Sequence, residues 1–365
     1  MDGIERGRSS PVEATALGSD NAQLAAGARY SLALKLDGRV VGFGYGIYGG
    51  LGLGHEGACC PGREPSPVEV TALGSDNAQV VTGVGSEHTL VLKMDGRVMA
   101  FGTNRNGQIG DGPTVVCPSE QTHCDPRFVF SPVEVTALGS DYAQVATGDS
   151  HSIVLKADGR VMSFGLNDHG QLGDGSGGYG IFQANPVELT AVGSDNALVA
   201  AGGDHSMVLK LDGRVVAFGR NHFGELGSDV TTCPASAGIG TCAGPVEATA
   251  LGSGNVQMVF GEGHSLVLTG DGRVMACGHN DYGQLGDGTT DEDRHSPIEV
   301  TALGSDNAQV VTGRTYSLVL KVDGRVMAFG MDNYGQLGDG TVEDRHSPIE
   351  VTALGLENAQ VVAGD

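Results

Sequence analysis

The sequence predicts an all-β propeller built from four-stranded blades, and three observations lead to this fold class. Pro-Val-Glu or Pro-Ile-Glu occurs seven times along the chain. The apolar runs between the motifs are short, β-branched and bounded by Gly, Asn and Asp, and no segment keeps a helical period. Four-stranded units repeated in this way are typical of blades packed around a channel. A second motif, Asp-Gly-Arg-Val, occurs six times at intervals of about 50 to 65 residues, beginning at Asp37, Asp95, Asp158, Asp212, Asp271 and Asp323.

Residues 307–354 show how one repeat divides into strands. Four strands, named a, b, c and d in chain order, are expected over 309–312, 317–321, 325–329 and 348–354. Asp323-Gly324 between strands b and c predicts a two-residue hairpin turn, because a type I′ turn needs positive φ at both central positions. Strand b is apolar on both of its faces in every repeat, so we expect it to lie between packed layers.

The strand count leaves the number of blades open. Six repeats are complete, and a spare d strand over 11–17 and a spare a strand over 360–363 remain at the two ends. We expect a seven-bladed ring, in which the spare strands meet in one closing blade that lacks strands b and c. A six-bladed ring with redundant ends is the alternative. A single propeller then fills residues 1–365, and the abrupt end at Asp365 suggests a fragment of a longer product.

Several motifs in each repeat resemble the regulator-of-chromosome-condensation repeat. The resemblance is carried by Gly-Gly-Asp-His-Ser-Met-Val-Leu-Lys-Leu-Asp-Gly-Arg-Val-Val-Ala-Phe-Gly at 202–219, followed by Asn-x-x-Gly-Glu-Leu-Gly at 221–227. The same signature stands at 151–175, 264–288 and 316–340, so the resemblance covers nearly the whole chain. It implies a seven-bladed propeller. It does not imply one activity, because function lies in sites grafted onto folds.

Members of this family include an exchange factor for the small GTPase Ran, propeller modules of large ubiquitin ligases, a plant ultraviolet-B photoreceptor and a secreted inhibitor of β-lactamase. The photoreceptor senses light through clustered Trp, and this chain has no Trp, which excludes that mechanism. The exchange factor also contacts chromatin. The net charge of −23 opposes binding to nucleic-acid phosphates or anionic lipid and favours basic partners.

The sequence gives no sign of a membrane or export segment. No apolar run approaches the roughly 20 residues that span a bilayer. The first residues contain no apolar stretch typical of a signal peptide. We therefore expect a cytoplasmic or nuclear protein that binds neither membrane nor nucleic acid directly.

Six of the seven cysteines lie in insertions between strands c and d. Cys117 with Cys124, and Cys233 with Cys242, are close enough in sequence to close short disulfide loops, which would place the protein in an oxidising, extracellular compartment. Reduced thiols are the alternative. Zinc bound by Cys117, Cys124 and His123 is a third reading, but CxxC spacing is absent and we expect no metal.

No catalytic site or cofactor is expected. A Gly-x-Gly-x-x-Gly run at 44–49 matches the dinucleotide fingerprint but is followed by a Gly-rich loop, where the fingerprint needs a helix. The acidic residues of 287–293 do not have the spacing of a calcium-binding EF-hand loop. A His or Tyr begins strand b in each repeat and is expected to bond to the backbone of a neighbouring strand. These six residues are Tyr30, His88, His151, His205, His264 and Tyr316.

Strand alternation places the a–b and c–d loops on one face of the ring, here called the variable face. The b–c hairpins and d–a connections form the other, constant face. Aromatic residues and Arg supply most contact energy at interfaces, so the variable face is the predicted protein-binding surface, with neutral drift of exposed loops as the alternative. The candidate binding residues are Arg29, Tyr45, Tyr48, Glu87, Arg105, Asp204, Arg220, His222, Phe223 and Arg314.

These observations predict a non-enzymatic propeller that acts as a protein-binding scaffold or recruitment module. A guanine-nucleotide exchange factor for a Ran-like GTPase is the first alternative, and it would act by opening the nucleotide site without covalent chemistry. A secreted protein inhibitor is the second alternative, favoured if the loop cysteines are oxidised.

Overall fold

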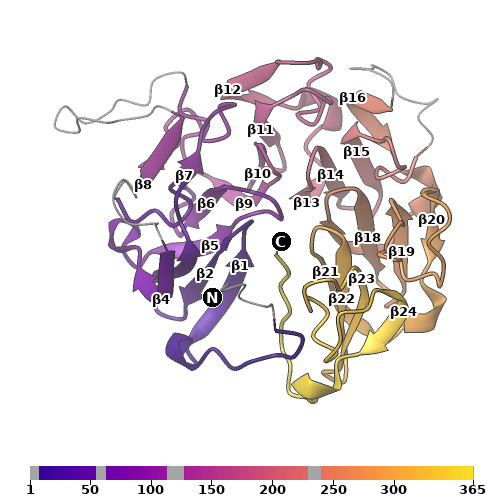
Figure 1. Cartoon of the computed structure of the whole chain (residues 1–365). Coiled ribbons are helices and arrows are strands. Elements are labelled where there is room, and N and C mark those ends of the chain that lie inside the picture. Colours follow the sequence, from indigo (N-terminus) through magenta and orange to yellow (C-terminus); the bar gives the residue numbers. More distant parts are fainter. Residues whose placement is uncertain (1–7, 55–62, 113–126, 229–239, 365) are drawn as a thin grey trace.

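A computed structural model describes residues 8–54, 63–112, 127–228 and 240–364 of the chain. The described strands form six four-stranded antiparallel sheets, each with its strands in chain order, arranged as blades around a central channel (Figure 1). We number the blades 1 to 6 in chain order. The fold class predicted from the repeats is therefore confirmed.

The strand bounds follow the predicted repeat closely, blade by blade. They are β1 Asn21–Ala26, β2 Tyr30–Lys35, β3 Val40–Tyr45 and β4 Arg63–Glu69; β5 Asn77–Val81, β6 His88–Lys93, β7 Val98–Thr103 and β8 Phe128–Glu134; β9 Tyr142–Thr147, β10 His151–Lys156, β11 Val161–Leu166 and β12 Phe182–Glu188; β13 Asn196–Ala201, β14 His205–Lys210, β15 Val215–Arg220 and β16 Thr241–Glu247; β17 Asn255–Phe260, β18 His264–Thr269, β19 Val274–Gly278 and β20 Arg294–Glu299; β21 Asn307–Thr312, β22 Tyr316–Lys321, β23 Val326–Gly330 and β24 Arg345–Glu350.

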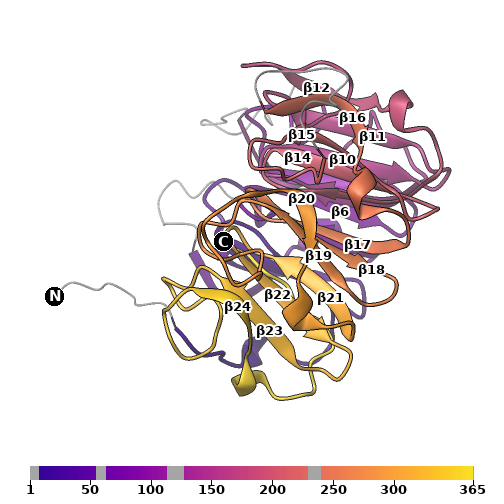
Figure 2. The ribbon, with the colours of Figure 1, turned by 90° about the vertical axis from the view of Figure 1, so that its right-hand side faces the viewer.

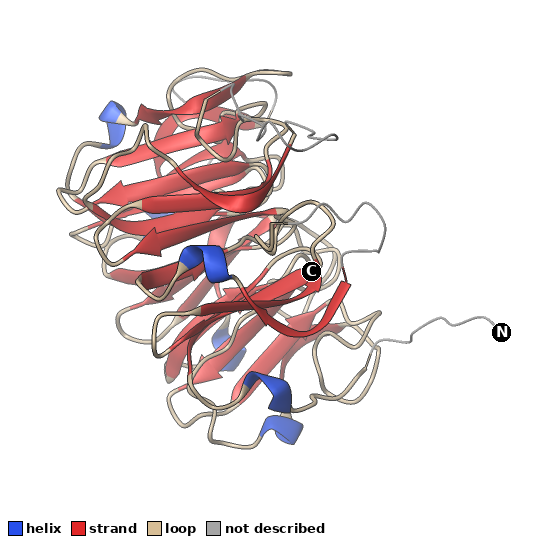
Figure 3. Ribbon diagram, turned by 90° about the vertical axis from the view of Figure 1, so that its left-hand side faces the viewer, coloured by secondary structure: helices blue, strands red, loops and turns tan. Residues whose placement is uncertain are grey.

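The d strand predicted over 348–354 extends too far toward the C-terminus. In the structure this strand, β24, ends at Glu350, and the residues after it form a short 3₁₀ helix, as they do in most repeats (Figure 3). The described 3₁₀ helices are η1 Thr15–Leu17, η2 Thr71–Leu73, η3 Thr190–Val192, η5 Thr249–Leu251, η6 Thr301–Leu303 and η7 Thr352–Leu354. No helix among the described residues is long and apolar enough to cross a membrane.

The predicted type I′ turn between strands b and c is wrong. Gly324 has φ +86° but Asp323 does not lie in the positive-φ region, and Gly324 N–H donates to the carbonyl of Lys321 at 3.0 Å. This is a three-residue loop that places only the Gly in the left-handed conformation. Asp323 instead accepts a hydrogen bond from the backbone N–H of Arg325 at 3.1 Å.

The two repeated motifs meet on the constant face. The Arg of Asp-Gly-Arg in blade 1, Arg39, pairs with Asp37 at 2.7 Å and with Glu69 of the Pro-Val-Glu motif at 2.9 Å. The other blades repeat this arrangement. These side chains are between about 38% and 52% exposed, so each pair contributes little stability. Because the Arg of one motif pairs with the Glu of the other in each blade, both motifs recur in every repeat.

The core lies between the blades, whose faces stack around the ring (Figure 2). Strand b is buried along its whole length in β6, as expected for a strand between layers. The Phe of strand c is fully buried in four blades, at Phe101, Phe164, Phe218 and Phe329. In blade 5 its place is taken by Cys277, a free thiol that is 1% exposed.

The described residues form six blades, which agrees with the alternative prediction of a six-bladed ring. The seventh, incomplete blade that we expected first is not formed. Residues 11–14 and 360–363 form no strand, because the described residues supply no b and c strands between them. The C-terminal segment nevertheless lies beside blade 6, where Val361 exchanges two hydrogen bonds with the side chain of Gln309 (3.0 and 3.2 Å). Together with the inner strands it lines the central channel, a cavity of about 310 Å³.

Candidate functional site

A groove of about 620 Å³ lies on the variable face over blades 4, 5 and 6. Its walls come from the a–b loops and c–d connections of these blades, the two kinds of segment in which the repeats differ. Aromatic and charged side chains dominate the lining. The lining residues are Arg220, Phe223, Glu262, Gly263, His279, Tyr282, Arg314, Thr315, Tyr316, Met331, Tyr334 and Gln336.

Arg220 is fixed at one end of this groove by three acceptors. Its Nε donates to the fully buried carboxylate of Glu225 at 2.9 Å, and its other nitrogens reach Asp204 at 3.5 Å and the backbone carbonyl of Glu262. Burial raises the pKa of Glu225, while the Arg220 charge beside it acts in the opposite direction. The guanidinium carbon lies 5.6 Å from the ring centre of Phe223. The cation is therefore held rigidly beside an aromatic ring.

A second ion pair crosses the groove between blades 5 and 6. Arg314 donates two hydrogen bonds to the carboxylate of Glu262, at 2.6 and 3.1 Å. These bonds lower the pKa of Glu262 and keep it ionised at neutral pH. Both side chains are substantially exposed, so a partner could contact them without opening the fold.

Aromatic rings line the part of the groove between these ion pairs. Phe223 packs against His279 with ring centres 4.6 Å apart, and His222 packs edge-on against Phe223 at 5.1 Å. Tyr334, at the blade 6 end, is 73% exposed. A large exposed aromatic on a groove wall is a typical anchor for a protein partner.

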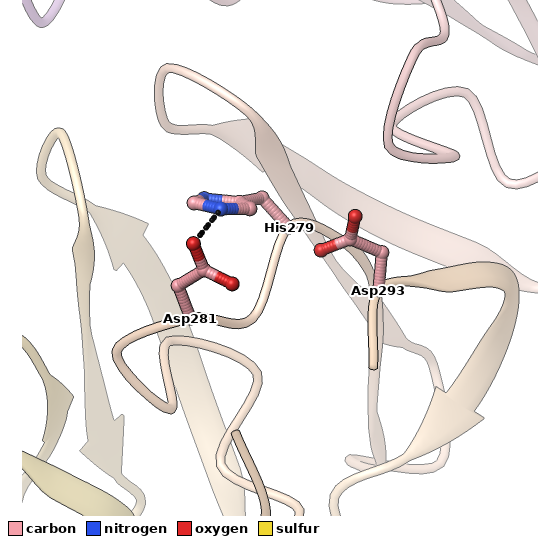
Figure 4. A group of neighbouring side chains, drawn as sticks. All are labelled: His279, Asp281 and Asp293. Carbon is pink, nitrogen blue, oxygen red and sulfur yellow. Dashed lines mark ion pairs between the residues drawn. The ribbon is translucent and has the colours of Figure 1, made fainter. Parts of the chain in front are cut away.

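His279 also lies near two carboxylates, Asp281 and Asp293 (Figure 4). Candidate ligand atoms of the three residues lie within 4.8 Å of one another. However, Nε2 of the imidazole already pairs with Asp281 at 3.0 Å, and Nδ1 contacts the side-chain amide of Gln284 at 3.0 Å. Because both ring nitrogens are engaged, we interpret the group as a hydrogen-bonded part of the groove wall. That the protein binds no metal is still a prediction.

The other candidate residues gather over blades 1 and 2. The rings of Tyr48 and Phe128 stack with centres 5.3 Å apart, and the Arg105 guanidinium lies 5.1 Å from the Phe128 ring centre. Arg29, Tyr45, Tyr48 and Glu87 line a small adjoining pocket. The ten predicted residues thus form two separate clusters on one face. Arg29, Tyr45, Tyr48, Glu87 and Arg105 form the first, and Asp204, Arg220, His222, Phe223 and Arg314 the second.

Sequence reasoning missed His279, Tyr334, Met331 and the buried Glu225. The repeats contained the signal. His279 and Met331 follow strand c at the position of Arg220, and Tyr334 precedes the loop Gly at the position of Phe223. Aligning all six c–d connections by position would have found them.

The His and Tyr residues that begin strand b form links between blades. Nε2 of His88 bonds to Oγ of Ser152 in the next blade at 2.9 Å, whereas a backbone partner was expected. That hydroxyl donates in turn to the carbonyl of Gln108 at 2.9 Å. The links are structural and buried, as predicted. The four His residues bond to a Ser side chain of the next blade, because a Ser or Thr follows the His or Tyr in every repeat. The two Tyr residues do bond to the backbone, since Tyr30 donates to the carbonyl of His88 at 3.1 Å and Tyr316 to that of Gly364 at 3.0 Å.

Of the predicted disulfide cysteines, Cys117, Cys124 and Cys233 lie outside the described residues, as do Cys59 and Cys60 and the proposed zinc ligand His123. Cys242 lies near the start of β16, where it is fully buried and disulfide-bonded. The other described cysteine, Cys277, is free, so the partner of Cys242 is not among the described residues.

A peptide map without reduction is expected to find Cys242 joined to Cys233. The two are nine positions apart, a loop length that local disulfides commonly close. Digestion and mass spectrometry with and without reductant measure this directly. Alkylation of Cys242 in unreduced, denatured protein would contradict the pairing, and Cys277, which should alkylate under the same conditions, is the internal control.

Comparisons with known proteins agree with the propeller fold. The model of the RCC1-like domain matches residues 121–365, and that of the regulator of chromosome condensation repeat matches residues 80–108. The chain is 30% identical over 334 residues to the ultraviolet-B receptor UVR8 of Arabidopsis thaliana, covering 90% of this chain and 69% of that one. It is 28% identical to the regulator of chromosome condensation of Xenopus laevis, covering 98% of this chain and 82% of that protein.

Two further similarities bear on the range of functions. The chain is 33% identical to the probable E3 ubiquitin-protein ligase HERC6 of Homo sapiens over 86% of this chain, but it spans only 29% of that protein. Among solved structures, Prp20p of Saccharomyces cerevisiae aligns with TM-score 0.77 and 20% identity, over 98% of this chain and 84% of that one. That structure was described with the binding of Prp20p to Gsp1p and histones.

Proposed function

The chain belongs to the family of RCC1-like domains, and from this premise we propose that it is a protein-binding propeller that recruits its partner through the groove over blades 4, 5 and 6. Relatives in this family range from a regulator of chromosome condensation to ubiquitin ligases, which supports a protein-interaction or exchange-type role. We place the protein in the cytoplasm or nucleus, with an extracellular location as the alternative that the Cys242 disulfide would favour.

The observation that carries this proposal is the composition of the groove. Ion-paired Arg side chains lie there beside aromatic rings, and both residue types are enriched among the residues that dominate the binding energy of protein interfaces. The constant face shows repeated ion pairs in place of such a cluster. The net charge of −23 favours a partner whose contact surface is basic at its rim.

Guanine-nucleotide exchange on a Ran-like GTPase is the second candidate. It is favoured by the likeness to the regulator of chromosome condensation, which extends over 82% of that protein. The two functions share a surface and differ in whether the partner binds most tightly without its nucleotide.

Affinity capture with a groove variant tests the proposal. The triple variant Phe223→Ala, Tyr282→Ala, Tyr334→Ala removes three rings from the groove, and we expect it to lose at least 100-fold in affinity for the main captured protein, since one interface anchor contributes about 2 kcal/mol or more. The matched control carries Leu36→Ala, Leu211→Ala and Val322→Ala, three apolar residues 73–74% exposed on the constant face. The control should bind as the unchanged chain does.

Capture is carried out with and without EDTA, which strips nucleotide from GTPases. A small GTPase enriched only after EDTA would make exchange the leading function. Partners captured equally under both conditions would favour the scaffold function over exchange. Equal capture by the groove variant and the control would contradict the choice of groove.

A further inference from the structure

In blade 6 a carboxyl group takes the place of an amide that other blades share. The c–d connection has an Asn at the same position in four blades, at Asn104, Asn167, Asn221 and Asn280. In blade 6 this position is held by Asp332. The side chain of Asp332 is 0% exposed, so its oxygens depend on the protein for hydrogen bonds.

The Asn side chain closes its connection with two hydrogen bonds. In blade 5, Oδ1 of Asn280 accepts from the N–H of Leu285 at 3.2 Å, and Nδ2 donates to Oδ1 of Asp287 at 3.1 Å. Blade 3 repeats both bonds, at 3.0 and 3.2 Å. The acceptor and the donor of one amide group therefore tie the turn of the connection to the acid that follows it.

Asp332 makes only the first of these two bonds. Its Oδ1 accepts from the N–H of Leu337 at 2.8 Å, which places Oδ2 where blades 3 and 5 have the amide nitrogen. The acid at the position of Asp287 is Asp339, whose side chain is 6% exposed. Oδ2 of Asp332 has no hydrogen-bond partner among the described residues. Two buried carboxyl groups thus face each other, and a proton on one of them would turn this contact into a hydrogen bond.

The surroundings of Asp332 favour uptake of that proton. Burial raises the pKa of Asp332 to about 6, the N–H of Leu337 lowers it, and the charges of Asp339 and Asp344 raise it further. The nearby charge of Arg345 acts in the opposite direction. The two carboxylates and the one guanidinium that act on Asp332 therefore leave an excess of negative charge around it.

Asp339 is suited to the role of acceptor. Burial opposes its ionisation, but hydrogen bonds from Thr341 and Arg345 outweigh burial and lower the pKa of Asp339. The N-terminal segment, which also packs on this connection, lies against it with the backbone of Arg8. The proton therefore belongs to Asp332, and Asp339 stays ionised beside it.

The same connection forms the blade 6 wall of the groove. Met331, Tyr334 and Gln336 line the groove and lie beside Asp332 in the chain, within the segment 331–339. Because the side chain of Asp332 holds this segment at Leu337, the position of the Tyr334 ring depends on how firmly the connection is closed.

We propose that Asp332 carries a proton that it shares with Asp339, and that this proton closes the blade 6 wall of the groove. The protonated carboxyl reproduces the Asn amide of blades 3 and 5, since Oδ1 accepts from Leu337 and the hydroxyl of Oδ2 donates to Asp339. Loss of the proton leaves two negative charges face to face, and the connection loosens. Mild acid therefore orders the wall that carries Tyr334. The use of this wall in binding rests on the proposed function, whereas the sharing of the proton does not.

Amide hydrogen exchange at Leu337, followed by NMR, tests the proposal without a partner. The internal reference is Leu285, the same position in blade 5, where Asn280 does not titrate. A carboxyl whose pKa is raised in the closed connection stabilises it in acid, and this contribution is lost as the pH rises through about 6. The protection factor of Leu337 relative to that of Leu285 should therefore be about fourfold higher at pH 5.5 than at pH 7.5.

Two variants exchange the residues between blades. Asp332→Asn should raise the protection of Leu337 at pH 7.5 by about tenfold, because a buried polar group regains its partner, and should remove the pH dependence. Asn280→Asp should transfer the pH dependence to Leu285. A ratio of the two protection factors that is equal at both pH values in the unchanged chain overturns the proposal, as does a pH dependence that persists in Asp332→Asn. These measurements involve no partner, so a failure of the proposed function would not alter them.

Discussion

Lowering the pH from 7.5 to 5 is expected to destabilise the propeller by several kcal/mol. Burial lowers the pKa of His88, His151 and His264 to about 3, and that of His205 well below its ordinary value. The unfolded chain binds protons at these histidines near pH 6.5, so between about pH 6.5 and 3 it holds more protons than the folded state. The contribution is complete above pH 6.5 and is lost as the pH falls, at about 2 kcal/mol for each histidine by pH 5.

Three carboxyl groups act in the opposite direction. Burial raises the pKa of Asp332 to about 6 and raises those of Glu225 and Asp111, so the folded state takes up protons there and gains relative stability in acid. The four histidines, each with a large shift, outweigh these three carboxyl groups. The surface aspartates of the Asp-Gly-Arg motifs have lowered pKa values and lose their contribution only below about pH 4.

Urea unfolding at pH 7.5, 6.5, 5.5 and 5 measures the slope. The matched variant is His264→Gln, whose amide can still donate to Ser317 but does not titrate. It should reduce the slope between pH 6 and 5 by about one proton. A free energy of unfolding that is unchanged between pH 7.5 and 5 would show that the buried histidines do not control acid stability.

The propeller was predictable because each of the six repeats shows the same strand pattern, so every repeat supports the same fold independently. A strand such as β22 is apolar on both faces, bounded by Gly at one end and Asp-Gly at the other, and the same pattern returns six times. The errors were local. The type I′ turn was wrong because Asp323 caps the loop with its carboxylate and never enters the positive-φ region.

The candidate groove was predictable only in part. Sequence variation predicted a binding surface on the variable face, and three of the ten candidate residues, Arg220, Phe223 and Arg314, line the groove. It could not show that the ten candidates separate into two clusters, because their separation depends on the angular place of each blade. The buried Glu225 was missed for a related reason: a Glu in a loop motif resembles a solvated charge until its partner is known.

Arg220→Ala is expected to destabilise the protein by about 3 to 5 kcal/mol, because it leaves the Glu225 carboxylate buried without its cation. Glu225 is 0% exposed and keeps only backbone N–H groups as partners among the described residues, that of Phe223 at 2.8 Å and its own. The penalty should shrink as the pH falls, since an unpaired buried carboxyl can then fold in its protonated form. Urea unfolding at pH 7.5 and 6 measures both effects.

The repeats themselves supply the rescuing variant. In blade 5 the positions of Arg220 and Glu225 are held by His279 and Gln284, which bond to each other at 3.0 Å. Arg220→His combined with Glu225→Gln should therefore recover stability to within about 1 kcal/mol of the unchanged chain, because no buried charge remains. Binding of the partner should stay weakened in this stable double variant, since the cation beside Phe223 is lost. If the double variant is as unstable as Arg220→Ala, the loss comes from packing of the arginine stem and the ion pair is not its cause. If it is stable and binds normally, the Arg220 charge has no part in recognition.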